Sequence, residues 1–161
     1  MPQARYAATT NVSRAKSTEE LETLLSKHGA TSFIAGTHEH HATIAFQIRD
    51  LRILMRVPLP DPKNPEFTAT PTGGTRATTT AHRLHTTAVH ATWRALLLLV
   101  KAKLVAVDQG VTTIEQEFLP HLLLPDGSTF ADHALTQIRQ AYATGQIPPL
   151  LPHPPRPAIE G

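Results

Sequence analysis

The stretch Thr43–Val57, TIAFQIRDLRILMRV, decides the fold, because apolar and polar residues alternate along it on both sides of one turn. The two halves, Thr43–Arg49 and Leu51–Val57, are separated by Asp50. Alternation with a period of two residues is typical of antiparallel strands that bury one face and leave the other in water. The residues expected to face the core are Ile44, Phe46, Ile48, Leu51, Ile53, Met55 and Val57.

Upstream of these strands the sequence predicts a helix and one further strand. Ser17 has the position of an N-cap and Glu20, three residues later, completes a capping box. We therefore predict a helix over residues 18–28, which Gly29 ends in a left-handed conformation. Residues 32–37 follow as the first strand of a three-stranded antiparallel sheet.

Downstream, proline, glycine and threonine dominate residues 58–80, so this segment is predicted to be a long mobile loop. A long helix is expected over residues 81–109, then a short helix capped by Thr112 or Thr113, and a last helix over residues 130–144 that ends at Gly145. The long helix has a near-heptad apolar stripe that widens between Leu96 and Val100, where we expect burial on most sides. The stripe comprises Val89, Trp93, Leu96, Leu97, Val100, Leu104 and Val107.

The predicted fold class is therefore α+β, with an N-terminal helix, a three-stranded antiparallel sheet, a long central helix and short C-terminal helices. Residues 1–16 are expected to form a flexible arm, residues 17–147 a single domain, and residues 148–161 a proline-rich tail.

Composition narrows the protein class. None of the 161 residues is cysteine, which excludes disulfides and thiolate zinc sites and is typical of a reducing cytoplasm. The first residues contain no apolar run of signal-peptide length, and the longest apolar run, at residues 95–100, is far too short to span a membrane. We expect a cytoplasmic protein without membrane contact. The net charge of +2 is too small to indicate a polyanionic partner by itself.

Standard catalytic signatures are missing from the sequence: GxxxxGK[ST], GxGxxG, GxSxG and HExxH are not found. Enzymatic activity is therefore not favoured, although an enzyme with dispersed catalytic residues is compatible with this result.

Arginines supply the main candidate site. They lie on the polar side of the predicted hairpin and at the junction of the loop with the long helix, where they could grip the phosphates of DNA or RNA. The alternative is that they only keep the sheet face soluble, and exposed aromatic residues for base stacking are scarce. The candidate nucleic-acid-binding residues are Arg49, Arg52, Arg56, Arg76 and Arg83.

Two metal sites are further candidates. Histidines near the end of the first strand and at i,i+3 on the long helix could bind zinc, or they could be surface residues without a ligand; they are His38, His40, His82 and His85. Acidic residues could bind Mg²⁺, although helix capping and the helix dipole explain them more simply; they are Asp108, Glu115, Glu117, Asp126 and Asp132.

Two stretches together carry a family resemblance. The first runs from Lys16 to Ala30, and the second contains WRALLL at residues 93–98, KAKL at 101–104, EFL at 117–119 and LPDG at 124–127. Over about residues 6–150 this order resembles a group of small, largely uncharacterised proteins encoded by tailed double-stranded DNA phages, many of actinobacterial hosts. The resemblance implies a phage accessory protein in the host cytoplasm and implies no activity. The sequence departs from this group near the start of the long helix, where arginine is usual in the group and this chain has His82, His85 and His90.

Three hypotheses about function follow. The first is a phage accessory protein that binds nucleic acid in replication, recombination or host take-over. The second is a non-enzymatic protein-interaction or self-assembling module that uses the long helix. The third is a metal-dependent enzyme or small-ligand binder with residues 58–80 as a lid.

Overall fold

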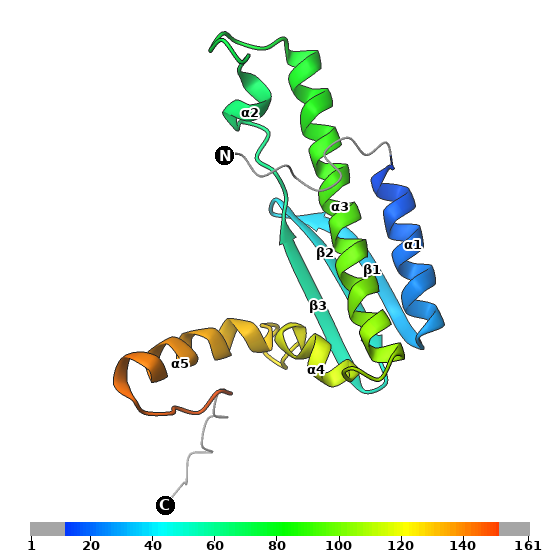
Figure 1. The fold of residues 1–161 in the computed structure, drawn as a ribbon, viewed down its shortest axis with the longest axis vertical. Helices are drawn as coiled ribbons and strands as arrows, with labels where there is room; N and C mark the ends of the chain where they lie inside the picture. Colours follow the sequence, from blue (N-terminus) through cyan, green and yellow to red (C-terminus); the bar gives the residue numbers. More distant parts are fainter. Residues whose placement is uncertain (1–11, 152–161) are drawn as a thin grey trace, which may run out of the picture.

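The computed structural model describes residues 12–151 and has a mixed α+β fold (Figure 1). Three strands form one antiparallel sheet in the order β1-β2-β3, and α1 and α3 lie side by side over one face of it. The predicted fold class is confirmed. The elements in chain order are α1 (Arg14–Lys27), β1 (Ala30–His38), β2 (His41–Ile48), β3 (Leu51–Pro58), α2 (Pro65–Thr68), α3 (Thr78–Asp108), α4 (Ile114–Phe118), η1 (Leu119–His121) and α5 (Phe130–Thr144).

Helix α1 begins four residues earlier than predicted. Its N-cap is Ser13, whose hydroxyl accepts a hydrogen bond from the Lys16 N–H at 3.2 Å. Ser17, predicted as the cap, lies inside the helix and is fully buried. Ser17, Leu21 and Leu25 are four residues apart and form the inner stripe of α1, so packing against the core extends the helix past Ser17. Residues 14–16, predicted as part of a flexible arm, thus belong to α1, and residues 1–11 of that prediction lie outside the described residues.

The sheet buries one face, as the alternation predicts. In β2 every second residue, from Ala42 to Ile48, is buried, and Ile53 and Met55 of β3 face the same core. Both hairpins have two-residue turns that contain positive φ angles: Glu39 and His40 in the first, and Arg49 in the second. A β-bulge interrupts β1 between Thr31 and Ile34. Strand β1 begins two residues earlier and ends one residue later than predicted.

Residues 58–80 contain a short helix and a β-bridge, whereas the sequence predicts a long loop without structure. Asn64 caps α2, and the ring of Phe67 is buried beside α3, where it meets the His85 ring edge-on with centroids 5.5 Å apart. A β-bridge between Ala69 and Thr75 closes the following turn. One buried aromatic residue in a polar stretch is a weak sequence signal, and its burial requires the neighbouring helix.

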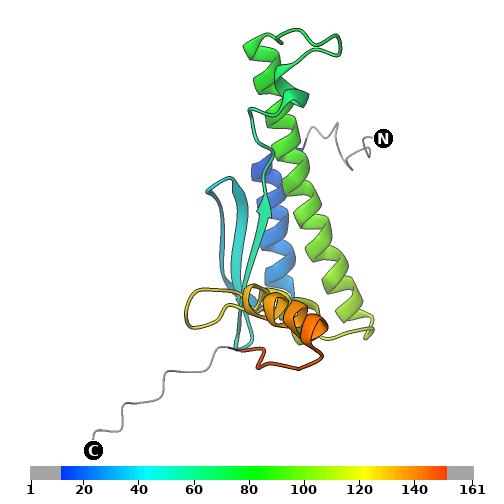
Figure 2. The same cartoon turned by 90° about the vertical axis from the view of Figure 1, so that its left-hand side faces the viewer.

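Helix α3 has 31 residues and extends beyond the sheet, with α2 packed along the protruding part (Figures 1 and 2). The predicted apolar stripe supplies much of the core, and Trp93, Val100 and Leu104 are fully buried. The predicted burial of residues 96–100 on most sides is wrong, because Leu99 remains 44% exposed. Neither α3 nor any other helix within residues 12–151 combines the length and hydropathy that a membrane-spanning helix needs.

The C-terminal helices agree closely with the sequence. Thr113 caps α4 and Thr129 caps α5, each in a capping box, and Gly145 ends α5 with a φ of 71°. Helix α5 packs on η1 and projects sideways from the base of the sheet (Figure 1). The proline-rich tail predicted from residue 148 lies for the most part, at residues 152–161, outside the described residues.

Candidate functional site

The five candidate arginines do not form one surface. Arg52 and Arg56 share the face of the sheet opposite α1 and α3, and their cross-strand partners on β2 are Gln47 and Thr43. Arg56 approaches the carbonyl of Gly127, with 3.5 Å between Nη2 and O. This part of the predicted basic face is confirmed by the register of the strands.

The other three arginines have separate places in the fold. Arg49 lies in the β2–β3 turn and pairs with Glu115, with 2.8 Å between Nη1 and Oε1. Arg76 donates a hydrogen bond to the Ala69 carbonyl at 2.7 Å and so holds the turn after α2. Arg83 is exposed on the protruding part of α3. Only Arg52 and Arg56, two of the five candidate arginines, therefore lie on a common surface.

The candidate zinc ligands are also dispersed. His38 and His40 are exposed at the β1–β2 turn, whereas His82 and His85 lie on α3. His85 has a structural role, because its Nε2 lies 2.9 Å from the Pro60 carbonyl and its ring meets Phe67. No group of three or more potential metal ligands occurs anywhere in residues 12–151.

The acidic residues considered for Mg²⁺ have other partners. Asp108 contacts His28, Glu115 pairs with Arg49, and Glu117 accepts from Lys103 Nζ at 3.2 Å. Asp132 accepts hydrogen bonds from the N–H and hydroxyl of Thr129, and these two bonds lower the pKa of its carboxyl. Capping and ion pairing thus account for these carboxylates.

Ser128, His133 and Asp126 lie together at the turn before α5. The Ser128 hydroxyl and the Asp126 carboxylate both contact the same imidazole nitrogen of His133, Nε2, at 2.8 and 3.1 Å. A catalytic triad needs the acid on one ring nitrogen and the nucleophile on the other. This cluster therefore stabilises a turn. Hydrogen bonds from Ser128 lower the pKa of the Asp126 carboxyl.

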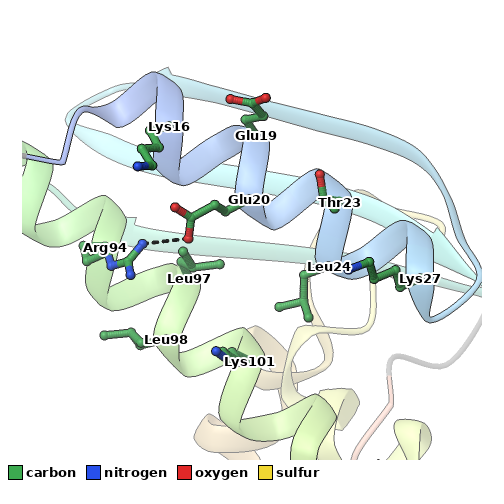
Figure 3. Close-up of a pocket in the computed structure, with 10 residues that line it drawn as sticks. All are labelled: Lys16, Glu19, Glu20, Thr23, Leu24, Lys27, Arg94, Leu97, Leu98 and Lys101. Atoms are coloured by element: carbon green, nitrogen blue, oxygen red, sulfur yellow. Dashed lines mark hydrogen bonds and ion pairs between the residues drawn. The ribbon is translucent and has the colours of Figure 1, made fainter.

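A groove lies between α1 and α3, on the side away from the sheet (Figure 3). Its volume is about 400 Å³. The floor is apolar: Leu97 is buried, and Leu24 and Leu98 are half-buried. Leu24 comes from α1, and Leu97 and Leu98 come from α3, so the floor is formed where the two helices pack together.

Basic side chains stand at both ends of this groove. Lys16 and Arg94 are at one end, and Lys27 and Lys101 are at the other (Figure 3). Arg94 Nη1 pairs with Glu20 Oε2 across the groove at 2.8 Å, which ties the two helices together. The four basic residues face only two acidic ones, and the three lysines have no ion-pair partner in the described part of the chain.

His28, which follows Lys27 at the end of α1, connects this helix to α3. Its Nδ1 lies 2.8 Å from the Leu24 carbonyl, and its Nε2 lies 3.0 Å from Asp108 Oδ2. Because both partners are acceptors, the doubly protonated imidazolium satisfies both contacts. The Leu24 carbonyl, and then the Asp108 carboxylate, raise the pKa of His28 above its ordinary value.

The residues that line this groove are visible in the sequence, but the sequence does not show that they lie together. Lys16, Lys27 and Lys101 each have ordinary helix-surface positions, and Leu98 belongs to a broad apolar run. Their convergence depends on how α1 packs against α3, which no local pattern specifies.

Comparisons with protein-family models, with curated proteins and with solved structures gave no match. The resemblance to tailed-phage proteins and the host location that it implies therefore stay predictions.

Proposed function

We propose that the protein is a non-enzymatic interaction module that binds an acidic, amphipathic helix of a partner protein in the α1–α3 groove. The observation that carries this proposal is the lining of the groove: an apolar leucine floor between two pairs of basic side chains. A partner helix with leucines on one face could bury them on this floor. Flanking glutamates would meet Lys16, Lys27 and Lys101.

The composition of the lining favours a helix over other ligands. Leucines with no exposed aromatic ring offer nothing on which nucleic-acid bases could stack. The groove is open along its length, which suits an elongated partner better than a small molecule enclosed on all sides. Exposed Ala102 and Val105 continue the apolar surface along α3 beyond Lys101.

A designed peptide tests the proposal. A labelled helical peptide of about 20 residues, with leucines at i, i+3, i+4 and i+7 and glutamates beside them, is titrated with the protein in a fluorescence-anisotropy assay. A second peptide has the same leucines with lysines in place of the glutamates. We expect the acidic peptide to bind with a micromolar Kd that weakens with salt, and the basic one to bind at least about tenfold more weakly.

Variants locate the binding surface. Lys101→Glu should weaken binding of the acidic peptide about fivefold to tenfold, because it replaces attraction by repulsion at one end of the groove. Lys63→Glu is the matched control, since Lys63 is exposed before α2 and does not line the groove. Equal binding of both peptides, or equal effects of both variants, would refute the proposal.

Nucleic-acid binding is a second candidate, and one observation favours it. Arg52 and Arg56 lie with Gln47 and Thr43 on the sheet face opposite α1 and α3, where cationic and polar side chains could contact a phosphate backbone. Arg52→Ala with Arg56→Ala should then lower the affinity for DNA or RNA at low salt and reduce its salt dependence. An anisotropy titration without any binding to single- or double-stranded nucleic acid rejects this candidate.

A further inference from the structure

The two outer edges of the sheet differ. At the β3 edge, the Leu123 N–H donates to the Arg52 carbonyl at 2.8 Å and Leu122 forms a β-bridge with Ile53. Strand β1 pairs only with β2, and no other segment of residues 12–151 pairs with its outer side. The β3 edge is thus partly covered by the chain itself, whereas the backbone groups on the outer side of β1 pair with no strand among the described residues, and α1 lies beside Phe33 and Ala35.

Strand β1 lacks most of the features that protect open edges. Its sequence, ATSFIAGTH, contains no lysine, arginine, aspartate, glutamate or proline. Such residues commonly prevent an edge strand from pairing with another chain. The bulge between Thr31 and Ile34 protects the first part, with Ser32 at a φ of 57°. A regular stretch remains from Ile34 to His38.

The hairpin geometry shows which backbone groups point outward. Glu39 and His40 form a two-residue turn with positive φ at both positions, so the flanking pair, His38 and His41, carries hydrogen bonds between the strands. Hydrogen-bonded and non-hydrogen-bonded positions alternate along an antiparallel pair. The N–H and C=O groups of Ala35 and Thr37 are therefore directed away from β2.

We propose that two copies of this chain associate through their β1 edges, antiparallel about a two-fold axis at Gly36, to form one continuous sheet. In this register Ala35 of each copy exchanges backbone hydrogen bonds with Thr37 of the other. Ile34, which is 67% exposed on the open face, then lies opposite His38 of the second copy.

The properties of β1 favour a second copy of this chain as the partner of its outer edge. Antiparallel pairing of identical strands about a two-fold axis is self-complementary, and a strand without charge does not repel its copy. A two-fold pair occupies the β1 edge of both copies, and Leu122 and Leu123 cover the β3 edge at Ile53 and Arg52. Pairing therefore closes at a dimer and does not continue into a fibre.

Sedimentation velocity over a concentration series of the full chain tests the dimer. We expect a reversible monomer–dimer equilibrium. Thr37→Pro removes an outward N–H without removing a bond to β2, and should raise the dimer dissociation constant at least about tenfold. Thr37→Val keeps the N–H and is the matched control, with an unchanged constant.

Two further measurements test the dimer even if the Thr37→Pro substitution disturbs folding. Ile34→Lys leaves the backbone intact, replaces an exposed apolar contact by a charge, and should also weaken the dimer. Amide hydrogen exchange at Ala35 and Thr37 should slow as the protein concentration rises, whereas exchange in β2 should not change. A strict monomer at all concentrations, or a dimer that is insensitive to Thr37→Pro and Ile34→Lys, would overturn the proposal.

This dimer is independent of the groove. The groove lies on the helix side of the sheet, and β1 meets its copy at the sheet edge. Lys101→Glu should therefore leave the dimer unchanged, and Ile34→Lys should leave peptide binding unchanged.

Discussion

The inner and outer sides of α3 look alike in sequence but differ in the structure. On the inner side, Trp93, Val100 and Leu104 are fully buried against α1 and the sheet. On the outer side, Leu99 and Val105 are 44% and 49% exposed. An apolar pattern shows that a helix side can be buried, but the rest of the chain decides whether it is.

The difference indicates how each side is used. The inner side is filled by residues of the same chain, so its leucines stabilise the fold. The outer side and the adjoining groove have basic residues but no cover from other described residues. A helix that is apolar on both sides is normally buried on both, and the partner helix proposed for the groove would cover the part of the outer side that lies next to α1.

The largest expected effect tests the inner side. Trp93→Ala should lower the free energy of unfolding by about 3–5 kcal/mol, because it removes a fully buried indole and leaves a cavity. Leu99→Ala is the control from the outer side and should cost less than about 1 kcal/mol. Urea denaturation followed by far-UV circular dichroism measures both. Comparable losses would show that the outer side is also buried, as it would be in a stable assembly.

The next effect tests peptide binding at the part of α3 that borders the groove. Leu98→Asp places a charge on the groove floor and should weaken the acidic peptide about tenfold or more. Leu99→Asp, one residue further on and outside the groove lining, should change the affinity little. Fluorescence anisotropy gives both dissociation constants. If Leu99→Asp proves the more damaging substitution, the partner helix binds to a different side of α3.

Two serines of α1 sharpen the contrast between exposed and buried positions. Ser13→Ala removes the N-cap and should lower the unfolding free energy by about 1 kcal/mol. Ser17→Ala removes a buried hydroxyl that has no hydrogen-bond partner among the described residues, and should be neutral or stabilise by up to about 1 kcal/mol. Thermal unfolding of the two variants distinguishes these outcomes. The reverse ranking would restore Ser17 as the cap.

The smallest effect is a pH dependence at the contact between α1 and α3. The pKa of His28 is raised above its ordinary value of 6.5 by the Leu24 carbonyl and Asp108. Its stabilising contribution is therefore complete below about pH 6.5 and is lost as the pH rises through the folded-state pKa. His28→Gln should reduce stability more at about pH 6 than at about pH 9. His82→Gln, at an exposed position of α3, is the matched control, and urea midpoints at both pH values measure the effect.

Local sequence signals predicted much of the fold. Helix α5 was predicted with its observed bounds, and Gly145 is a strong stop signal; in the structure Thr129 caps its start. The start of α1 was missed because Ser13 and Ser17 are both acceptable caps, and only the burial of Ser17 beside Leu21 distinguishes them. Helix α2 was missed because its stability depends on one residue, Phe67, meeting α3.

The candidate sites were harder to predict than the fold. Arg52 and Arg56 share a face because strand alternation puts them there, and this was predicted correctly. Arg49 could not be separated from them, because its pairing with Glu115 joins positions 66 residues apart. The groove and the open β1 edge are properties of neighbouring elements, so neither has a local sequence signature.

The sequence by itself determined the positions of the three strands and of the main helices, α2 excepted, and which side of each strand is apolar. These properties follow from interactions between residues a few positions apart. The tertiary structure alone decided that the outer side of α3 stays exposed, that Lys16, Lys27 and Lys101 converge on a leucine floor, and that Leu122 covers one sheet edge while β1 stays open. These depend on contacts between distant segments, whose geometry is fixed only when the whole core packs.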